Sequence, residues 1–524
     1  MKTFNFILTL VSITLFSSGL MAQTPGTFNN NFGSSGYQWY DVNSKNQYGF
    51  AIATQPDGKI LIGGIHEHTN DKYDWIVYRL KTNGMLDNTF GSNGKYSNSF
   101  SDQDYLTGIG VQSNGKIIIC GYSDMDTSSW DIIVHRLNAD GTLDNTFGNS
   151  GTVQLDRSIG QADAVKKMIV GPNDEIYLGG YMQISGDAYF LVHKLLPNGD
   201  PDSSFSLDGS QFVDMDDDGI VNDMVLADDG SIFLCGNVDG GNNGNKMAIL
   251  KIKPNGHFDN SFAGDGIKLF QPGIGQEGYI FGITALPDGS VMGVGMKDNA
   301  SADALVMKLT PTGLLDGTFN GNGFYELDLT IGAYDYFKRI ERLANGKYLA
   351  LAETKMNNIR KGRLYQLNAD GSIDGTAYAN GTGHLDISIS SGSEFVSEIA
   401  VNNNFAYTIG NFDSGLSDDI FVTSSHLYNP VGISEQPLTS TNMTIFPNPV
   451  NSGTQVQISL DDEIKGAVEI SIVSMTGQTI YYDSFYKMSE VYDHKVMLES
   501  FTPGIYLVKV NNGNRVGAQK LIIH

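Results

Sequence analysis

Three aspartates stand at alternate positions, Asp214, Asp216 and Asp218, and Gly219 follows directly. This D-x-D-x-D-G spacing presents alternate carboxylates to a hard cation such as calcium, while the glycine allows a sharp turn. A complete EF-hand loop is excluded, because its twelfth position, which requires a bidentate acid, holds Val225. The pattern makes calcium the one candidate cofactor, and an ordinary acidic turn is the competing interpretation.

Other chemistry-bearing residues form weaker patterns. His66 and His68 are two residues apart, so on a strand they would face the same way and could bind zinc, but nothing nearby completes such a site. A solvated loop is therefore the preferred interpretation. The sequence contains no G-x-S-x-G, no H-E-x-x-H, no phosphate-binding glycine loop and no paired cysteine motif. No catalytic residue is predicted, and the sequence favours a protein that is not an enzyme without deciding the question.

The elements that would position these residues belong to a repeat. One phrase, a turn followed by a short apolar strand, recurs seven times at a period of about 58 residues, as in QPDGKILIGG, QSNGKIIICG and ADDGSIFLCG. The turn residues are Gly58, Gly115, Asp174, Gly230, Gly289, Gly346 and Asn404. So regular a period indicates stacked copies of one supersecondary unit, none of which can bury its apolar faces alone.

Further positions recur at fixed offsets. A basic residue is followed eight positions later by Asp, then by Phe and by Gly, as in Arg79, Asp87, Phe90 and Gly94. Gly would supply positive φ and Phe an apolar plug. The base and the Asp are expected to be framework; a ring of binding charges is the less favoured interpretation.

Each repeat is expected to hold four strands; in the second these are residues 94–100, 105–111, 116–122 and 131–137. Radial repetition of such units predicts an all-β, seven-bladed β-propeller. The N-terminal fragment FNNNFGSSGYQWYDV, with Phe32 and Gly36, matches a part of the repeat that is missing after the last strand, Ile420 to Leu427. This fragment should therefore pair beside Ile420 and close the ring, since an open edge would leave backbone groups unpaired.

The two cysteines, Cys120 and Cys235, hold the same position in repeats two and four. Sheets pack about 10 Å apart, so equivalent atoms two sheets away lie beyond the roughly 7 Å that a disulfide spans. Both are expected to be buried free thiols.

The phrases QPDGKI, VYRLKTNGMLDNTFGSNG and VHRLNADGTLDNTFGNSG resemble the delta-60 repeat of secreted and surface bacterial proteins. The resemblance covers residues 26 to about 428 and implies a propeller-like module without an assigned chemistry.

Four segments divide the chain. Residues 1–22 have a basic Lys2 and a short apolar core, which predicts a signal peptide cleaved after Ala22. Residues 23–428 form the predicted propeller, residues 429–441 a linker, and residues 442–524 a small C-terminal β-sandwich with alternating strands such as VEISIV. No run outside the signal could cross a bilayer.

The C-terminal segment resembles the type A sorting domain of the type IX secretion system. The matching residues are Pro447, Asn448, Pro449, Gly477, Pro503, Gly504, Tyr506 and the terminal strand Lys520 to Ile523. The resemblance implies that the secretion machinery is a partner and that the mature protein reaches the outer surface or the surroundings of a Gram-negative bacterium. An ordinary adhesive β-sandwich is the alternative.

The net charge of −25 makes nucleic acid or anionic membrane an improbable partner. Short polar loops such as HEHTNDKY and SDMDTSS could contact a glycan or a protein. We therefore expect a monomeric, secreted or surface-displayed propeller that acts in binding or adhesion. The alternative is an extracellular polysaccharide hydrolase or lyase that uses loop carboxylates at the propeller channel; a carboxyl with a raised pKa beside an ionised one would favour it.

Overall fold

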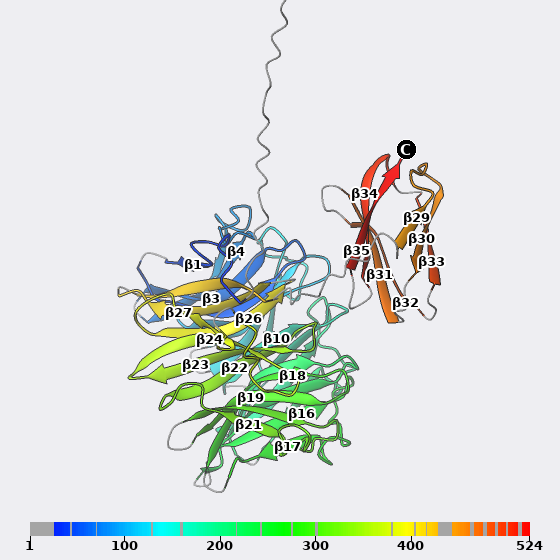
Figure 1. The fold of residues 1–524 in the computed structure, drawn as a ribbon. Helices are drawn as coiled ribbons and strands as arrows, with labels where there is room; N and C mark the ends of the chain where they lie inside the picture. The colour runs from blue at the N-terminus through cyan, green and yellow to red at the C-terminus, as the bar shows by residue number, and fades with distance from the viewer. Residues whose placement is uncertain are drawn as a thin grey trace, which may run out of the picture. The chain divides into compact units, whose positions relative to one another are not determined.

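The computed structural model divides into two compact units, residues 1–427 and residues 428–524 (Figure 1). The residues described here are 26–41, 44–69, 71–126, 129–157, 161–215, 217–241, 244–273, 276–298, 302–378, 381–402, 405–415, 417–427, 443–461, 466–474, 479–487, 491–498, 501–511 and 516–524. The predicted signal peptide, the predicted linker, Asp216 and Gly477 lie outside them. Within these ranges all regular elements are strands, as the sequence predicts, and no helix is long and apolar enough to cross a membrane.

In its described residues the first unit contains seven antiparallel sheets of four strands, numbered here along the chain. The first three are β2 (Gln47–Thr54), β3 (Ile60–Thr69), β4 (Lys72–Leu80), β5 (Lys95–Asn98); β6 (Asp104–Val111), β7 (Ile117–Asp126), β8 (Ser129–Leu137), β9 (Thr152–Leu155); and β10 (Asp163–Val170), β11 (Ile176–Ile184), β12 (Asp187–Leu195), β13 (Ser210–Val213).

Sheets four to six are β14 (Gly219–Leu226), β15 (Ile232–Val238), β16 (Lys246–Ile252), β17 (Ile267–Phe270); β18 (Glu277–Ala285), β19 (Val291–Asp298), β20 (Asp303–Leu309), β21 (Phe324–Leu327); and β22 (Tyr334–Arg342), β23 (Tyr348–Met356), β24 (Ile359–Leu367), β25 (His384–Ile387). Sheet seven joins β26 (Glu394–Asn402), β27 (Phe405–Asp413) and β28 (Asp418–His426) to the N-terminal strand β1 (Tyr37–Tyr40).

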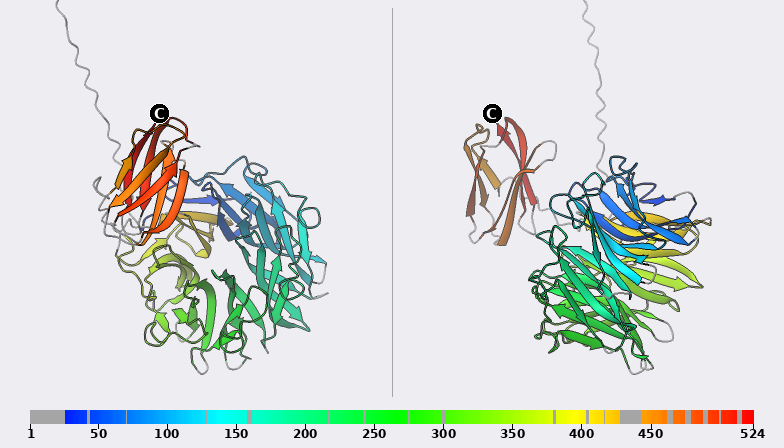
Figure 2. Two further views of the ribbon diagram at one scale, coloured as in Figure 1. Left: turned by 90° about the vertical axis from the view of Figure 1, so that its right-hand side faces the viewer. Right: turned by 180° about the vertical axis from the view of Figure 1, so that it is seen from behind.

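The first strands of the seven sheets lie closest to a common axis. Each contacts the first strand of the next sheet, in the order β2, β6, β10, β14, β18, β22 and β26, and β26 contacts β2 again. Figure 2 shows the consequence, because the blue start of the repeat region lies beside its yellow end. The series of sheets thus returns on itself.

The N-terminal strand completes sheet seven where the sequence places it. Tyr40 pairs with Ile420 and Tyr37 with Thr423 in an antiparallel register. Backbone bonds extend the contact, since the Gly26 N–H donates to the His426 carbonyl at 3.0 Å. The edge of β28 is therefore covered by a segment almost 400 residues away in sequence.

The grouping of strands differs from the sequence-based expectation. The segment expected as the first strand of repeat two, residues 94–100, contains β5, and β5 pairs with β4 of the preceding sheet. Each of the first six sheets thus takes its outermost strand from the stretch that follows its own third strand, and sheet seven takes β1 instead. Strand locations were predicted correctly, whereas this assignment to sheets was wrong, because a sequence repeat has no intrinsic starting point.

The recurring Phe and Gly have the predicted roles. The buried plugs are Phe32, Phe90, Phe147, Phe205, Phe262 and Phe319. Gly94 has a φ of 88°, which only glycine adopts easily, where the chain turns into β5. A Cβ at Gly141 would lie 2.7 Å from the Phe90 ring, so this glycine lets adjacent repeats approach closely.

The second unit contains two sheets in its described residues. One is β29 (Met443–Phe446), β30 (Gln455–Asp461) and β33 (Val491–Met497); the other is β32 (Thr479–Lys487), β31 (Gly466–Ser474), β34 (Gly504–Asn511) and β35 (Val516–Ile523). Alternate apolar residues of both sheets, among them Ile458, Ile470 and Val508, pack into one buried core.

Candidate functional site

Every first strand of the seven sheets contains a bulge at an equivalent place, where the register shifts by one residue. The residues directly after the shift are Ala51, Gly108, Lys167, Asp223, Gly282, Arg339 and Glu398. Four of the seven are charged. Because the bulge lies on the innermost strand of every sheet, these four side chains meet near the axis of the unit, and we call them the axial charge cluster.

The axial charge cluster is connected by ion pairs between different sheets. The Lys167 ammonium lies 3.3 Å from an Asp223 oxygen and 2.8 Å from Glu398 Oε2, and the Arg339 guanidinium lies 3.0 Å from the same Glu398 oxygen. Arg339 also donates to the Phe281 carbonyl at 2.8 Å. Asp223 is 3% exposed and Glu398 8% exposed, so both carboxylates depend on these partners.

Glu341 lies two residues beyond Arg339 on β22. Its side chain is exposed to solvent, but the surrounding protein removes part of its hydration. This desolvation is the largest cause that raises the pKa of Glu341, to about 7. The charge of Lys167 lowers the pKa and the charge of Glu398 raises it further. Burial also opposes ionisation of Glu398, but Lys167 and Arg339 outweigh it and lower the pKa of Glu398 to about 2. Glu341 therefore titrates near neutral pH, whereas Glu398 is ionised there.

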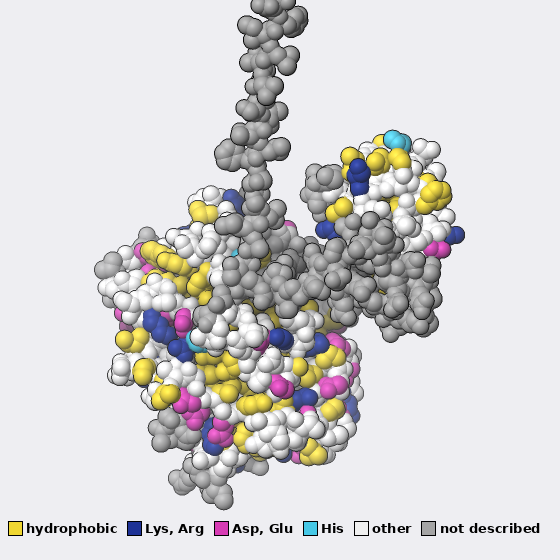
Figure 3. Space-filling model, viewed as in Figure 1, with side chains coloured by type: hydrophobic (Ala, Val, Ile, Leu, Met, Phe, Trp, Pro, Cys, Tyr) yellow, Lys and Arg dark blue, Asp and Glu magenta, His cyan; other side chains and the backbone are white. Residues whose placement is uncertain are grey.

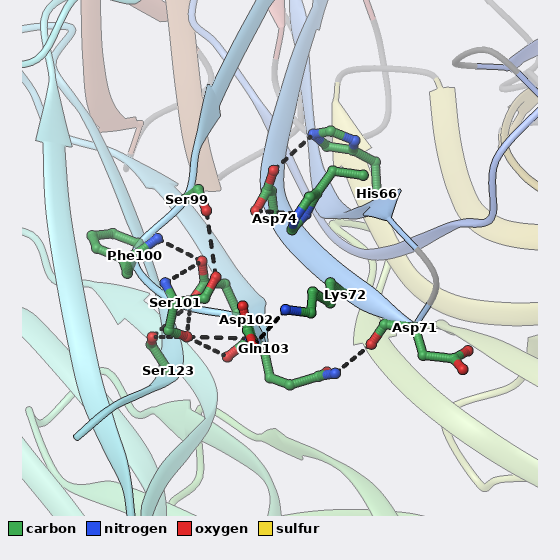
Figure 4. A network of polar contacts seen from close by, with 12 residues as sticks. His66, Asp71, Lys72, Asp74, Ser99, Phe100, Ser101, Asp102, Gln103 and Ser123 are labelled. Carbon is green, nitrogen blue, oxygen red and sulfur yellow. Dashed lines mark hydrogen bonds and ion pairs between the residues drawn. The ribbon is translucent and has the colours of Figure 1, made fainter. Parts of the chain in front are cut away.

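A second set of acids lies four residues before the bulge and is structural. Asp104, Asp163, Asp335 and Glu394 are fully buried at equivalent places. Each accepts a backbone N–H from the loop that leads into its strand, from Phe100, Arg157, Thr330 and Ile389 respectively, at 2.6 to 2.7 Å. Ser101 and Ser123 also donate to Asp104 at 2.9 and 2.6 Å. Figure 4 shows the loop with Phe100 and Ser101. These acids hold the connections between sheets.

The recurring basic and acidic residues pair as expected of a framework. Arg79 contacts Asp87 at 3.0 Å and Arg136 contacts Asp144 at 2.6 Å. The framework role was predicted on the assumption that these pairs are exposed at the surface. The structure differs, since these four side chains are at most 8% exposed. Arg136 also donates to the Pro197 carbonyl at 2.6 Å, so the pair connects neighbouring repeats.

Half-buried aromatic side chains of sheets one and two form a continuous series of ring contacts. Ring centroids lie 6.5 Å apart for Phe50 and Tyr48, 6.0 Å for Tyr48 and Tyr73, and 6.3 Å for Tyr73 and Tyr105. Tyr105 then lies 5.2 Å from Tyr122 and 5.6 Å from Trp130. We call these six residues the aromatic run.

A comparable arc occurs in sheets five to seven. Tyr279 lies 6.0 Å from Phe281, Phe281 lies 5.5 Å from Tyr336, and the Arg360 guanidinium lies 5.1 Å above Phe395. A hollow of about 510 Å³ beside this arc is lined by Tyr334, Lys355 and Arg360 among others.

The aromatic run lies at the same end of the sheets as the variable polar loops. Gln47, at the start of β2, pairs with His66 near the end of β3, and Tyr73 at the start of β4 pairs with Glu67. The loop between β3 and β4 therefore borders the run. Sequence reasoning missed these aromatics, although Tyr48, Tyr105, Tyr279 and Tyr336 each stand ten residues before their turn glycine, and that offset could have revealed them.

Of the predicted calcium ligands, Asp214 and Asp218 are exposed at the connection between β13 and β14, and Asp216 lies outside the described residues. The Asp218 side chain accepts the Ala188 N–H at 2.7 Å, which ties it to β12. Among the described residues no group of three acids, histidines or cysteines is arranged to hold a metal ion. Calcium binding stays a prediction.

The two histidines share an acid that sequence reasoning did not identify. His66 Nε2 lies 3.9 Å from the Asp74 carboxylate across the β3–β4 hairpin (Figure 4). His68 Nδ1 lies 3.1 Å from the same carboxylate. Desolvation is the largest cause that lowers the pKa of His66. Cys120 and Cys235 are buried free thiols, as predicted.

In the second unit the predicted motif residues lie around the terminal strand. The Asn448 amide donates to the Lys520 carbonyl at 2.6 Å and accepts the Ile522 N–H at 2.9 Å. Tyr506 donates to the Thr502 carbonyl at 2.8 Å and packs on Phe501. Pro447, Pro449, Pro503 and Gly504 flank these contacts along the chain. The side chain of Asn448 thereby holds the start of this unit to its last strand.

Two family models match the chain. Residues 444–524 match a secretion system C-terminal sorting domain. Residues 55–90, 112–147 and 227–262 match a domain of unknown function, DUF5122, described as a β-propeller. Curated proteins give no match.

Among solved structures, a protein of unknown function from Dyadobacter fermentans is 9% identical, with 75% of this chain and 98% of that chain covered at a TM-score of 0.42. A PL25 ulvan lyase is 10% identical, with 74% and 96% covered at a TM-score of 0.41. An endo-arabinase from Bacteroides thetaiotaomicron is 11% identical, with 62% and 94% covered at a TM-score of 0.32. Similarities this distant carry no inference about activity.

The sorting domain implies export as a secreted or cell-surface protein through the type IX machinery. In the first unit, the DUF5122 matches and the repeated four-stranded sheets both indicate β-propeller repeats. The chain therefore carries a type IX secretion C-terminal sorting domain at residues 444–524, and three stretches before it match DUF5122 β-propeller repeats.

Proposed function

We propose that residues 23–428 form a seven-bladed propeller, closed by the N-terminal strand, that acts outside the cell as a binding or adhesion module. Its ligand is a glycan or a protein. Residues 1–22 are a signal peptide, residues 429–441 a linker, and residues 442–524 a sorting β-sandwich. The mature protein is a monomer at the outer surface of a Gram-negative bacterium or in its surroundings.

The aromatic run carries this proposal. Half-buried aromatic rings beside polar loops combine a rigid apolar surface with hydrogen-bonding groups, the composition that recognition surfaces favour. The rings belong to the first two sheets and border the loops in which the repeats differ most. On the described part of the face drawn in Figure 3, basic and acidic side chains are interspersed rather than gathered by sign, which suits neither nucleic acid nor an anionic membrane.

The test is an array that displays extracellular polysaccharides and matrix proteins, probed with the labelled mature chain, together with a screen for polysaccharide fragments. Binding to an array member, without fragments, is expected. Replacing Trp130 by alanine should reduce that binding at least tenfold, while the exposed control Asp228→Asn should leave it unchanged. Failure to bind any member would contradict the proposal.

Glu341 and Glu398 support one alternative, an extracellular polysaccharide hydrolase or lyase. A carboxyl with a pKa near 7 and a second carboxyl that stays ionised suit acid–base chemistry. Against this, Glu398 is already committed to two ion pairs. If the fragment screen detects products and Glu341→Gln abolishes them, the enzyme is the correct assignment.

A further inference from the structure

Lys166 is an unusual cation among the described residues near the aromatic run. Its ammonium lies 5.3 Å from the centroid of Tyr122 and 5.7 Å from that of Tyr181. The side chain is half-buried, and burial alone lowers its pKa. Within the described part of the chain, no carboxylate lies within ion-pair distance of it, although the protein carries a net charge of −25.

Nearby cations behave differently. Lys167, the next residue, pairs with Asp223 and Glu398. Lys72, in the hairpin beside Tyr73, pairs with Asp102 at 2.6 Å. Removing a charge from water is costly unless a partner compensates it, and cation–π contacts return only part of that cost. A half-buried ammonium between two tyrosines is therefore arranged to receive an anion from outside.

The neighbouring rings specify what else that anion carries. Trp130 lies 5.3 Å from Tyr122 and 5.6 Å from Tyr105, so ring surface extends from Lys166 back across sheets two and one. Such a surface suits a chain of flat units with apolar faces. Pyranose rings have such faces, formed by their axial C–H groups, and hydroxyls at the edges for the adjacent polar loops.

We propose that the aromatic run and Lys166 bind an acidic polysaccharide, with sugar rings stacked on Tyr105, Tyr122 and Trp130 and a carboxylate or sulfate group on the Lys166 ammonium. This rests on the proposed binding function and names its ligand class. Single-stranded nucleic acid also stacks on aromatic rings and is the competing ligand that the titration below separates from an acidic polysaccharide.

The experiment uses the full mature chain and calorimetric titration with four probes: polygalacturonate, dextran sulfate, neutral dextran and single-stranded DNA. The expected result is binding to polygalacturonate, dextran sulfate or both, at least tenfold tighter than to dextran or DNA. Comparison of the first two probes distinguishes carboxylate from sulfate. Preference for dextran or DNA, or no binding to either acidic probe, would overturn the proposal.

Variants separate charge from stacking. Lys166→Met keeps the apolar stem and should weaken acidic binding at least tenfold, Lys166→Arg should retain most of it, and Lys268→Met on the outermost strand of sheet four is the matched control. Trp130→Phe provides a second readout, because quenching of tryptophan fluorescence on binding should be reduced. Unchanged affinity of the folded Lys166→Met variant for the acidic probes would refute the proposed ligand class. If the protein then bound dextran or a protein on the array, the wider binding function would still stand.

Discussion

At the scale of single residues, several donors stabilise a buried carboxylate. Asp144 illustrates this, since Lys116, Thr146 and Arg136 all donate to it. Burial opposes its ionisation, but these hydrogen bonds hold the pKa of Asp144 well below its usual range. The stability it contributes is present above its unfolded pKa near 4 and is lost as pH falls through the lower folded value.

Removal of one partner from such a pair should be costly. We expect Asp144→Ala to lower the free energy of unfolding by about 3 kcal/mol at pH 7, because it leaves the Arg136 charge buried and uncompensated. Asp316→Ala is the matched control: its pair with Lys308 is more exposed, at 14% and 19%, so the loss should be smaller. Urea unfolding of both variants provides the measurement, and equal losses would contradict the role of burial.

Glu341 should give stability the opposite dependence on pH. Its pKa is about 7 in the folded protein, above its ordinary value of 4.5, so the folded state binds the extra proton between these values. Its stabilising effect is complete below about pH 4.5 and is lost as pH rises through 7. Glu341→Gln, which cannot ionise, should therefore gain melting temperature relative to the wild type from pH 5 to pH 8. Asp228→Asn should show no such trend; a constant difference for Glu341→Gln would contradict the shifted pKa.

At the scale of elements, the first strands do more than form sheet edges. Each contains a bulge at the position nearest the axis, and in sheets two, three, six and seven a buried acid four residues earlier holds the incoming loop. Ala51, Gly108 and Gly282 occupy the axial position in the other sheets. A Cβ on Gly282 would lie 2.9 Å from the Arg339 Cα, so the small residue makes room for the next sheet. The charges therefore come only from sheets three, four, six and seven.

The closing strand allows a direct test by cross-linking. Gly36 and Ser424 are opposite each other, and the Ser424 N–H donates to the Gly36 carbonyl, so Tyr37 and Thr423 form a non-hydrogen-bonded pair. Such pairs have Cα atoms about 4.5 Å apart, within the range of a disulfide. Tyr37→Cys with Thr423→Cys should oxidise to an intramolecular bond, detected by mass spectrometry. Gln38→Cys with Thr423→Cys should not, because the side chains lie on opposite faces; the reverse result would contradict the register.

At the scale of the whole molecule, the chain divides its tasks between two units with separate cores. The sorting unit depends on its last residues, because Asn448 bonds to Lys520 and Ile522 of the terminal strand and the Val450 N–H donates to the Ile522 carbonyl at 2.9 Å. Export should therefore depend on the integrity of this end of the chain rather than on the repeats.

Deletion of residues 442–524 should stop delivery of the protein to the medium or the outer surface, with accumulation inside the cell envelope. Asn448→Ala should reduce export severalfold, because it removes two hydrogen bonds that hold the terminal strand; Asn451→Ala, an exposed neighbour, should not. Immunoblots of cell and medium fractions in a bacterium with a type IX system measure both effects. Full export of the truncated chain would contradict the assigned role.

Much of this architecture follows from the sequence alone. The steady spacing of the turn residues predicts the number and content of the repeats, and the incomplete last repeat predicts that the N-terminal fragment pairs beside Ile420. Buried Phe90, positive φ at Gly94 and the free thiols follow in the same way. These features are determined by residues close in sequence or by a repeated register, which is why a single chain reveals them.

The tertiary structure alone decided which side chains meet. Lys167, Asp223, Arg339 and Glu398 are separated by more than 50 residues from one another, and their types differ between repeats, so no local pattern marks them as one cluster. The same holds for Lys166, whose aromatic neighbours come from β7 and β11. The pattern of a strand determines which side chains alternate between its two faces. Which side chains of different sheets meet at the axis depends on how the sheets pack around it, and only the complete series of sheets determines that packing.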